Sequence, residues 1–232
     1  MSGQTPVRGE SGLNQAAEGV IKFSIERWER TPALDESLFF ELERVRAKLV
    51  DRGLVGVDAA TGIGYGNLSR RLDEGRFVIT GSQTGGLASL DGRHYVIITG
   101  ADFARGTVSC YGPVAPSSES LSHAAFYADA RVGPDVNVGA DMRVGAVLHV
   151  HWRARWEALL EAARDGRGYL EGRPFRVVGP EAAYGSRELY ERIRALMAEP
   201  ELDLPVLLAL AGHESGLFAA GGDAEEAYRW LS

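Results

Sequence analysis

The sequence predicts an α/β fold in which one sheet is layered with helices. Short apolar runs of strand length alternate along the chain with longer segments whose apolar residues recur at helical spacing. The run 204–210 is almost continuously apolar, as expected of a central strand that is covered on both faces. With 232 residues, the chain is long enough for one sizeable domain and marginal for two, so a single domain spanning 1–232 is predicted.

In the first half, residues 1–15 are polar and glycine-containing, so we expect them to be loose and the core to span about 36–231. A helix is predicted over 36–50, followed by Gly53 as a residue that suits its end. The apolar residues of this segment share one helical face: Leu38, Leu42, Val45 and Leu49. Runs rich in β-branched and aromatic residues then predict three strands: 77–80, 95–99 and 107–111.

A second helix is predicted to begin with Ser117 or Ser118 as its N-cap and to end near residue 128. Its polar residues repeat every four positions and form a stripe separate from its apolar face: Glu119, His123 and Tyr127. Within this stripe, His123 is interpreted as a structural, hydrogen-bonded residue.

The second half is predicted to continue with a strand at 144–151, a helix over 156–163 and a strand at 175–178. Ser186 is expected to cap the next helix, and the run 204–210 to pair as a hairpin with 217–220. The last helix is predicted from two residues at the spacing of a capping box: Asp223 and Glu226.

Composition excludes several classes of protein. The formal net charge is −7 and the chain has no basic cluster, which argues against a nucleic-acid-binding protein. The single Cys110 rules out an internal disulfide and fits a reducing compartment. The first residues resemble no secretory signal, and no apolar stretch approaches the roughly 20 residues that span a bilayer. We therefore expect a cytoplasmic protein without a membrane or nucleic-acid partner.

Two histidines, His149 and His151, are separated by one residue in the strand predicted at 144–151, so they point to the same face. In a dry core, both cannot easily be satisfied by hydrogen bonds, because each neutral ring brings a donor and an acceptor. Binding one metal ion through one nitrogen each solves this problem. The competing interpretation is a pair of hydrogen-bonded core histidines.

His213 lies beside glycine at the end of the run 204–210 and is a candidate third ligand. Three histidines with an open fourth position are typical of a catalytic rather than a structural zinc site, although a histidine in a turn after a strand is the alternative. Glu119 is the candidate acid/base. Its position is explained equally well by the positive end of a helix, which stabilises a carboxylate.

Ser117 and Ser118 at a helix start can hold an anion through their hydroxyls and free backbone amides. Asn67 in a glycine-rich turn, and Thr84 with Gly85 in an amide-rich loop, are candidates to complete such a pocket. Each signal is weak alone, because ordinary turn chemistry explains all of them.

Taken together, these segments resemble the class II aldolase/adducin family. The matching pieces run in the family's order from about residue 38 to 231: 66–69, 78–80 with Thr84 and Gly85, 116–119 with His123 and Tyr127, 149–151, and His213 with Gly216 and Gly222. The Ser-Ser-Glu segment followed at this distance by His-x-His is fairly specific, whereas the glycine loops are not.

The resemblance implies a three-layer α/β/α fold with a largely antiparallel central sheet. It implies His149, His151 and His213 as ligands of a divalent metal, most often Zn²⁺, and Glu119 as the acid/base. It implies a pocket for the phosphate or equivalent anion of a small-molecule substrate, lined by Asn67, Thr84, Gly85, Ser117 and Ser118. It also implies a homo-oligomer, often a tetramer, with sites near the subunit interfaces.

The leading hypothesis is a metal-dependent lyase of carbohydrate metabolism, which cleaves or forms a carbon–carbon bond in a small hydroxy-carbonyl compound through a metal-stabilised enediolate. An epimerase, dehydratase or decarboxylase that uses the same enolate is the alternative, as is a non-catalytic, adducin-like interaction domain. The chain departs from the family where Glu214 and Ser215 separate His213 from Gly216, and Glu214 is a further candidate to approach the site. Two tyrosines are available to assist catalysis without a motif that fixes their role: Tyr184 and Tyr228.

Overall fold

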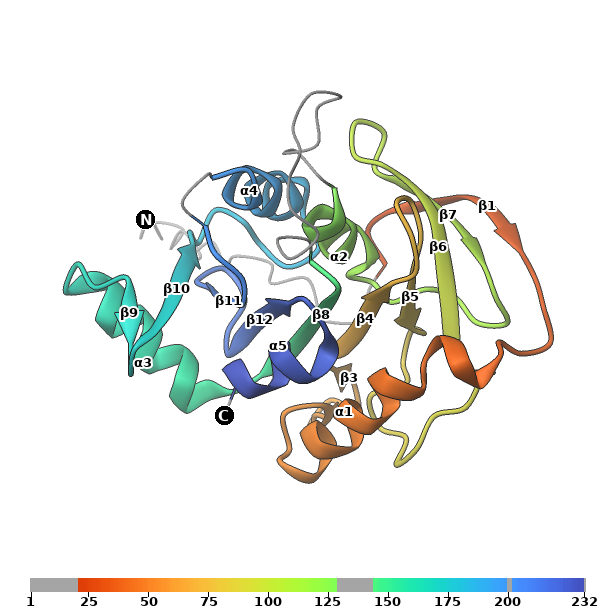
Figure 1. The fold of residues 1–232 in the computed structure, drawn as a ribbon, viewed down its shortest axis with the longest axis horizontal. Coiled ribbons are helices and arrows are strands. Elements are labelled where there is room, and N and C mark those ends of the chain that lie inside the picture. Colours follow the sequence, from red (N-terminus) through yellow and green to blue (C-terminus); the bar gives the residue numbers. More distant parts are fainter. Residues whose placement is uncertain (1–20, 129–143, 200–201, 232) are drawn as a thin grey trace, which may run out of the picture.

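The structure is a computed structural model that describes residues 21–128, 144–199 and 202–231. The segment 1–15, predicted to be loose, lies outside the described residues. Within the described ranges, ten strands form one sheet and two short strands form a separate hairpin (Figure 1).

The large sheet contains β1 (Ser24–Glu29), β4 (Asn67–Arg71), β5 (Phe77–Thr80), β6 (Tyr95–Asp102), β7 (Thr107–Tyr111), β8 (Ala146–His151), β9 (Tyr169–Leu170), β10 (Arg173–Val178), β11 (Val206–Leu210) and β12 (Gly216–Gly221). The hairpin pairs β2 (Gly56–Val57) with β3 (Gly64–Tyr65). The helices are α1 (Phe40–Asp51), α2 (Ser120–Tyr127), α3 (Arg153–Arg164), α4 (Arg187–Met197) and α5 (Ala224–Trp230), with a 3-10 turn, η1 (Glu36–Leu38), before α1.

The strand order is β1-β7-β6-β5-β4-β8-β12-β11-β10-β9. Among the described strands, only β1 with β7 and β10 with β11 pair in parallel, and the other neighbours are antiparallel. In the middle of the sheet, His149 of β8 lies opposite Asn67 of β4 on one side and opposite Phe218 of β12 on the other. These three strands therefore bring distant parts of the chain together at one point.

Helices cover both faces of the sheet (Figure 1): α2 and α4 lie on one face, and α1, α3 and α5 on the other. Each face has its own buried apolar cluster. One joins α2 and α4 to side chains such as Ile79, Val147 and Phe218, and the other joins α1, α3 and α5 to Leu68 and Leu148. The predicted three-layer α/β/α fold with a largely antiparallel sheet is confirmed.

Most predicted elements are present, and their differences have local causes. The helix predicted over 36–50 begins only at residue 40, because Asp35 caps the 3-10 turn instead, accepting a hydrogen bond from the backbone of Ser37 at 2.9 Å. Ser186 caps α4 as predicted. Asp223 caps α5, but the Glu226 carboxylate reaches the backbone N–H of Gly222 rather than that of Asp223, so the predicted capping box is displaced by one residue.

The start of α2 corrects a prediction that matters for the site. Neither Ser117 nor Ser118 is the N-cap, because the backbone carbonyl of Ser117 accepts from the Ser120 N–H in a turn and α2 begins at Ser120. Glu119 occupies the N-cap position, with φ −101° and ψ 16°. Its side chain makes no capping hydrogen bond and is therefore available for other contacts. No helix in the described part of the chain is long and apolar enough to cross a bilayer.

Candidate metal and substrate site

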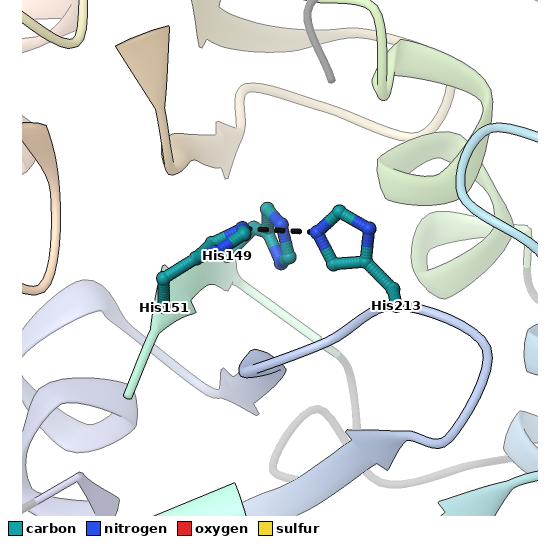
Figure 2. Close-up of side chains that lie close together, drawn as sticks. All are labelled: His149, His151 and His213. Carbon is teal, nitrogen blue, oxygen red and sulfur yellow. Dashed lines mark hydrogen bonds between the residues drawn. The ribbon is translucent and has the colours of Figure 1, made fainter. Parts of the chain in front are cut away.

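Three imidazole rings converge where β8 ends (Figure 2). His149 and His151 project from β8, and His213 projects from the turn between β11 and β12, with the rings pointing toward one another. The Nε2 atoms of His151 and His213 are 2.9 Å apart. One nitrogen from each of the three rings lies within 4.8 Å of the other two. The structure thus brings together the three histidines predicted as metal ligands.

Hydrogen bonds to the Nδ1 atoms determine where two of these rings carry their protons. His149 Nδ1 contacts the backbone carbonyl of Leu217 at 3.1 Å, and because a carbonyl only accepts, this nitrogen bears the hydrogen. His151 Nδ1 lies 3.1 Å from the hydroxyl of Ser215, which itself donates to the carbonyl of Glu214 at 2.6 Å. Ser215 must therefore accept from His151. Both rings consequently present the lone pair of Nε2 to the centre of the cluster.

The turn that carries His213 is shaped by its neighbours. A Cβ on Gly216 would come within 2.1 Å of the imidazole Cδ2, so only glycine lets the ring lie against the start of β12. Ser215 adopts a left-handed φ of 61°, a conformation that glycine adopts more easily. On its other side, His213 stacks against the ring of Tyr184, with centroids 4.9 Å apart and planes 24° apart.

Glu119 lies beside this cluster. Its side chain is fully buried, and its Oε2 is 3.1 Å from His149 Nε2. Since His149 donates through Nδ1, a lone pair of the ring faces a carboxylate oxygen, and two buried acceptors in contact repel each other. Either a proton on the carboxyl group or a metal cation between or beside the two atoms removes the conflict. The donor set of three imidazoles with a carboxylate in reach therefore fits a divalent metal ion such as Zn²⁺.

Burial keeps these ligands in the form that binds metals. Desolvation holds the pKa of His149 well below its usual value, and the proximity of His151 and His213 lowers it further, because protonated imidazoles would repel one another. Burial also lowers the pKa of His213 to about 3. Both rings are thus neutral at physiological pH, as a metal ligand must be.

A second buried network links α2 to β4. His123 Nε2 lies 2.5 Å from Asn67 Oδ1, and His123 Nδ1 lies 2.6 Å from the hydroxyl of Ser69. The Ser69 hydroxyl is also 2.7 Å from that of Tyr127. Burial lowers the pKa of His123 to about 3, so this ring is neutral. The interpretation of His123 as a hydrogen-bonded structural residue agrees with these contacts.

A pocket of about 560 Å³ opens next to the histidine cluster, and all five residues predicted to bind substrate line it: Asn67, Thr84, Gly85, Ser117 and Ser118. Tyr184 lines the same pocket and hydrogen-bonds to Ser118. Asn67 and Tyr184 join the pocket to the histidine cluster, because Asn67 donates to Glu119 at 3.3 Å and Tyr184 stacks on His213. Its lining, within the described residues, carries hydroxyl, amide and backbone groups and no charged side chain.

The loop that carries Thr84 and Gly85 is held in place from α1. Arg46, 1% exposed, pairs with Glu43 and donates to the backbone carbonyls of Leu87 and Ala88, both at 3.0 Å. Glu43 accepts in turn from the backbone N–H of Leu90 at 2.9 Å. These contacts fix the far side of the loop against the body of the protein.

Two further candidates lie away from the site. Glu214, considered able to approach the metal, is exposed and pairs instead with Arg153 on the surface. Tyr228 belongs to α5 on the opposite face of the sheet, where Lys48 and Arg52 lie over its ring. Sequence reasoning missed Ser69; the signal available was its position two residues after Asn67 in a strand, which places both side chains on one face.

A model of the Class II Aldolase and Adducin N-terminal domain family matches residues 52–232. No curated protein is significantly similar in sequence.

Among solved structures, YgbL from Escherichia coli, described as a candidate aldolase, epimerase or decarboxylase, is 21% identical with a TM-score of 0.53, over 84% of either chain. YgbL from Klebsiella pneumoniae, described in the same terms, is 18% identical with a TM-score of 0.51, over 84% of either chain. The N-terminal class II aldolase domain of a conserved Thermoplasma acidophilum protein is 16% identical with a TM-score of 0.50, over 86% of this chain and 91% of that one. At these identities the likeness establishes a shared fold.

Proposed function

Because the chain belongs to the class II aldolase and adducin N-terminal domain family, we propose that it is a metal-dependent lyase that acts on a small hydroxy-carbonyl compound. The observation that carries the proposal is the contact between Glu119 and His149 within the cluster of three histidines. A lone pair of His149 facing a carboxyl oxygen needs a proton or a cation between them, and a catalytic metal centre requires neutral imidazoles with a carboxylate within reach.

In this proposal His149, His151 and His213 hold a divalent metal, with Zn²⁺ as the favoured ion. When bound, the metal would polarise the carbonyl oxygen of the substrate and stabilise the negative charge of an enediolate. His151 Nε2 can only accept, so the hydrogen between the two rings lies on His213 Nε2. His213 must lose this hydrogen before its Nε2 can become a metal ligand.

Glu119 is assigned the proton transfer. In the condensing direction its carboxylate takes a proton from the carbon next to the carbonyl, and the electron pair of that C–H bond moves toward the carbonyl oxygen. The new carbon–carbon bond then forms between this carbon and an aldehyde carbon, and the aldehyde oxygen receives the proton that Glu119 removed, which restores the carboxylate. Cleavage follows the same steps in reverse, with Glu119 returning the proton to carbon.

The adjoining pocket supports a polar, small substrate. Its predicted residues Asn67, Thr84 and Ser117 offer amide and hydroxyl groups that can bind a phosphate or the hydroxyls of a sugar. Gly85 has a packing role as well, because a Cβ there would come within 2.5 Å of the Gly56 carbonyl. A homo-oligomer, with a tetramer favoured, and a cytoplasmic role in carbohydrate metabolism complete the proposal.

Two observations test the metal. Elemental analysis should find one divalent ion per chain in the purified protein, and added Zn²⁺ should raise the melting temperature of chelator-treated protein. His149→Ala should lose both properties. The matched control is His94→Ala, since the His94 ring accepts from the backbone N–H of Asp91 and is not part of the cluster of three histidines. Wild-type protein that contains no metal and shows no thermal shift would refute the proposal.

Catalysis is tested by following hydrogen–deuterium exchange next to the carbonyl, by NMR in D₂O, with hydroxyacetone, dihydroxyacetone and dihydroxyacetone phosphate as probes. Exchange without any partner aldehyde reports the proton transfer alone. Product analysis with added aldehydes, sugar phosphates and keto acids then separates a lyase from an epimerase, dehydratase or decarboxylase. An adducin-like, non-catalytic domain is favoured instead if His149→Ala changes neither metal content nor any activity.

A further inference from the structure

The side-chain amide of Asn67 bridges two buried groups of different character. One of its atoms contacts Glu119 Oε2 at 3.3 Å, and another contacts His123 Nε2 at 2.5 Å. An amide has a donating and an accepting end, so its direction decides whether Glu119 meets an N–H or an oxygen. Reversing the amide would place its oxygen against the carboxylate.

The direction of every hydrogen bond in this network follows from the orientation of the Asn67 amide. Asn67 Nδ2 donates to Glu119 Oε2, and Asn67 Oδ1 faces His123 Nε2. His123 must then carry its hydrogen on Nε2, and because the ring is neutral, its Nδ1 accepts from the Ser69 hydroxyl. Ser69 has thereby used its hydrogen and accepts in turn from Tyr127. All donors point one way, from Tyr127 to Glu119.

The hydrogen-bond network also connects α2, which Glu119 precedes, to β4 in the centre of the sheet. His123 and Tyr127 belong to α2, directly after Glu119, whereas Asn67 and Ser69 lie on one face of β4. His123 and Ser69 are both 0% exposed, so no water competes for these bonds. The Glu119 carboxylate and the start of α2 are therefore held in a fixed position relative to β4.

We propose that His123 is a positioning residue, which, supported by Ser69 and Tyr127, fixes the direction of the Asn67 amide and so holds Glu119 Oε2 toward His149. The inference rests on the proposed function only for its effect on turnover. The hydrogen-bond directions themselves follow from the contacts in the folded protein.

The competing interpretation is that the hydrogen-bond network transfers protons. Tyr127, at the far end of the network, also lines a second cavity of about 320 Å³ beside Arg71 and Phe77. The Asn67 link opposes it. An amide passes a proton from its nitrogen to its oxygen only by way of the unfavourable imidic acid form, whereas it transmits orientation through fixed bonds. The network of hydrogen bonds therefore fixes the orientation of the Asn67 amide and does not carry protons.

The first test needs no substrate. In long-range ¹H–¹⁵N NMR spectra of the zinc-loaded, full-length protein, His123 should show a hydrogen on Nε2 alone, unchanged between pH 8 and pH 5.5. The side-chain carboxyl ¹³C signal of Glu119, assigned with Glu119→Gln, should shift in Ser69→Ala. The matched control is Ser122→Ala, because Ser122 is equally buried on α2 and its hydroxyl makes no hydrogen bond within the described residues. A hydrogen on His123 Nδ1, or an equal carboxyl shift in both variants, overturns the proposal.

The second test separates positioning from mere structural support. With the probe that exchanges fastest in the wild type, His123→Leu should lower kcat on the order of 100-fold per folded, metal-loaded site, because small displacements of a catalytic group have effects of this size. Ser69→Ala should lower kcat about tenfold, the equivalent of one hydrogen bond, and Ser122→Ala should not. His123→Gln, whose amide can donate from nearly the position of Nε2, should recover most of the loss with KM little changed.

If both His123 variants lose activity only in proportion to folded protein, the positioning role is wrong. If the wild type exchanges none of the probes, the proposed function fails while the NMR result still decides the direction of the chain.

Discussion

Metal-free protein should lose stability steeply in mild acid, because three buried histidines are neutral in the folded state. They are His123, His149 and His213, and desolvation is the largest cause of the lowered pKa of each. In the unfolded chain a histidine has a pKa of about 6.5. Below that pH the unfolded state binds protons that the folded state does not, so acid favours unfolding.

The size of the effect follows from the same comparison. With the folded pKa of His123 and His213 near 3, each ring stays neutral at pH 5.5, whereas about nine-tenths of the unfolded rings are protonated there. Between pH 7.5 and pH 5.5 this costs about 1.4 kcal/mol of unfolding free energy for each histidine. The pKa of His149 is lowered in the same direction, so this ring adds to the loss. The stability is present above pH 6.5 and is lost as the pH falls toward 3.

Urea unfolding of chelator-treated protein, followed by tryptophan fluorescence at the two pH values, measures this difference. His123→Gln removes one of the three groups, so its loss of stability between the same pH values should be smaller than that of the wild type by about 1.4 kcal/mol. This comparison cancels the contribution of acidic residues that titrate in both proteins. A wild-type midpoint that does not move, or a variant that loses as much as the wild type, would contradict the burial of neutral rings.

Three further outcomes are expected. Glu119→Gln should keep one metal ion per chain by elemental analysis yet lower probe exchange by about 10²–10⁴-fold, and unchanged exchange would remove Glu119 from the chemistry. Gly85→Ala should displace the pocket loop, since its Cβ would meet the Gly56 carbonyl at 2.5 Å; KM should rise while metal content stays constant, and an unaltered KM would show that the pocket is not used. Phe218→Ala should reduce the unfolding free energy by about 3–5 kcal/mol in urea, because the ring is fully buried against His149 and Phe126, and a loss below about 1 kcal/mol would contradict this packing.

The sequence predicted the fold well where side-chain periodicity is strong. The helical stripe of α1 and the apolar run of β11 could be recognised because burial on one or both faces leaves a regular pattern. β1 was missed because its exposed and half-buried residues do not alternate regularly at the edge of the sheet. The start of α2 was placed too early, since a serine next to a helix is a common cap and nothing local shows that Glu119 takes that place.

The site was predictable as a list of candidate ligands but not as a hydrogen-bond network. Alternation along β8 placed His149 and His151 on one face, as the structure has them. Asn67 lies opposite His149 because of the register between β4 and β8, and this register depends on the whole sheet rather than on local sequence. For that reason Asn67 was assigned only to substrate binding, and its contacts with Glu119 and His123 could not be inferred.

Two of the three clustered imidazole rings are held by other groups of the protein. His149 is fixed by the Leu217 carbonyl and His151 by Ser215. If the proposed metal centre is correct, the protein can therefore fold first and bind its metal afterwards, with little reorganisation on loading. Chelation and reloading should be reversible in the native state, so the ion found in a given preparation reflects the supply of metal at least as much as the selectivity of the centre.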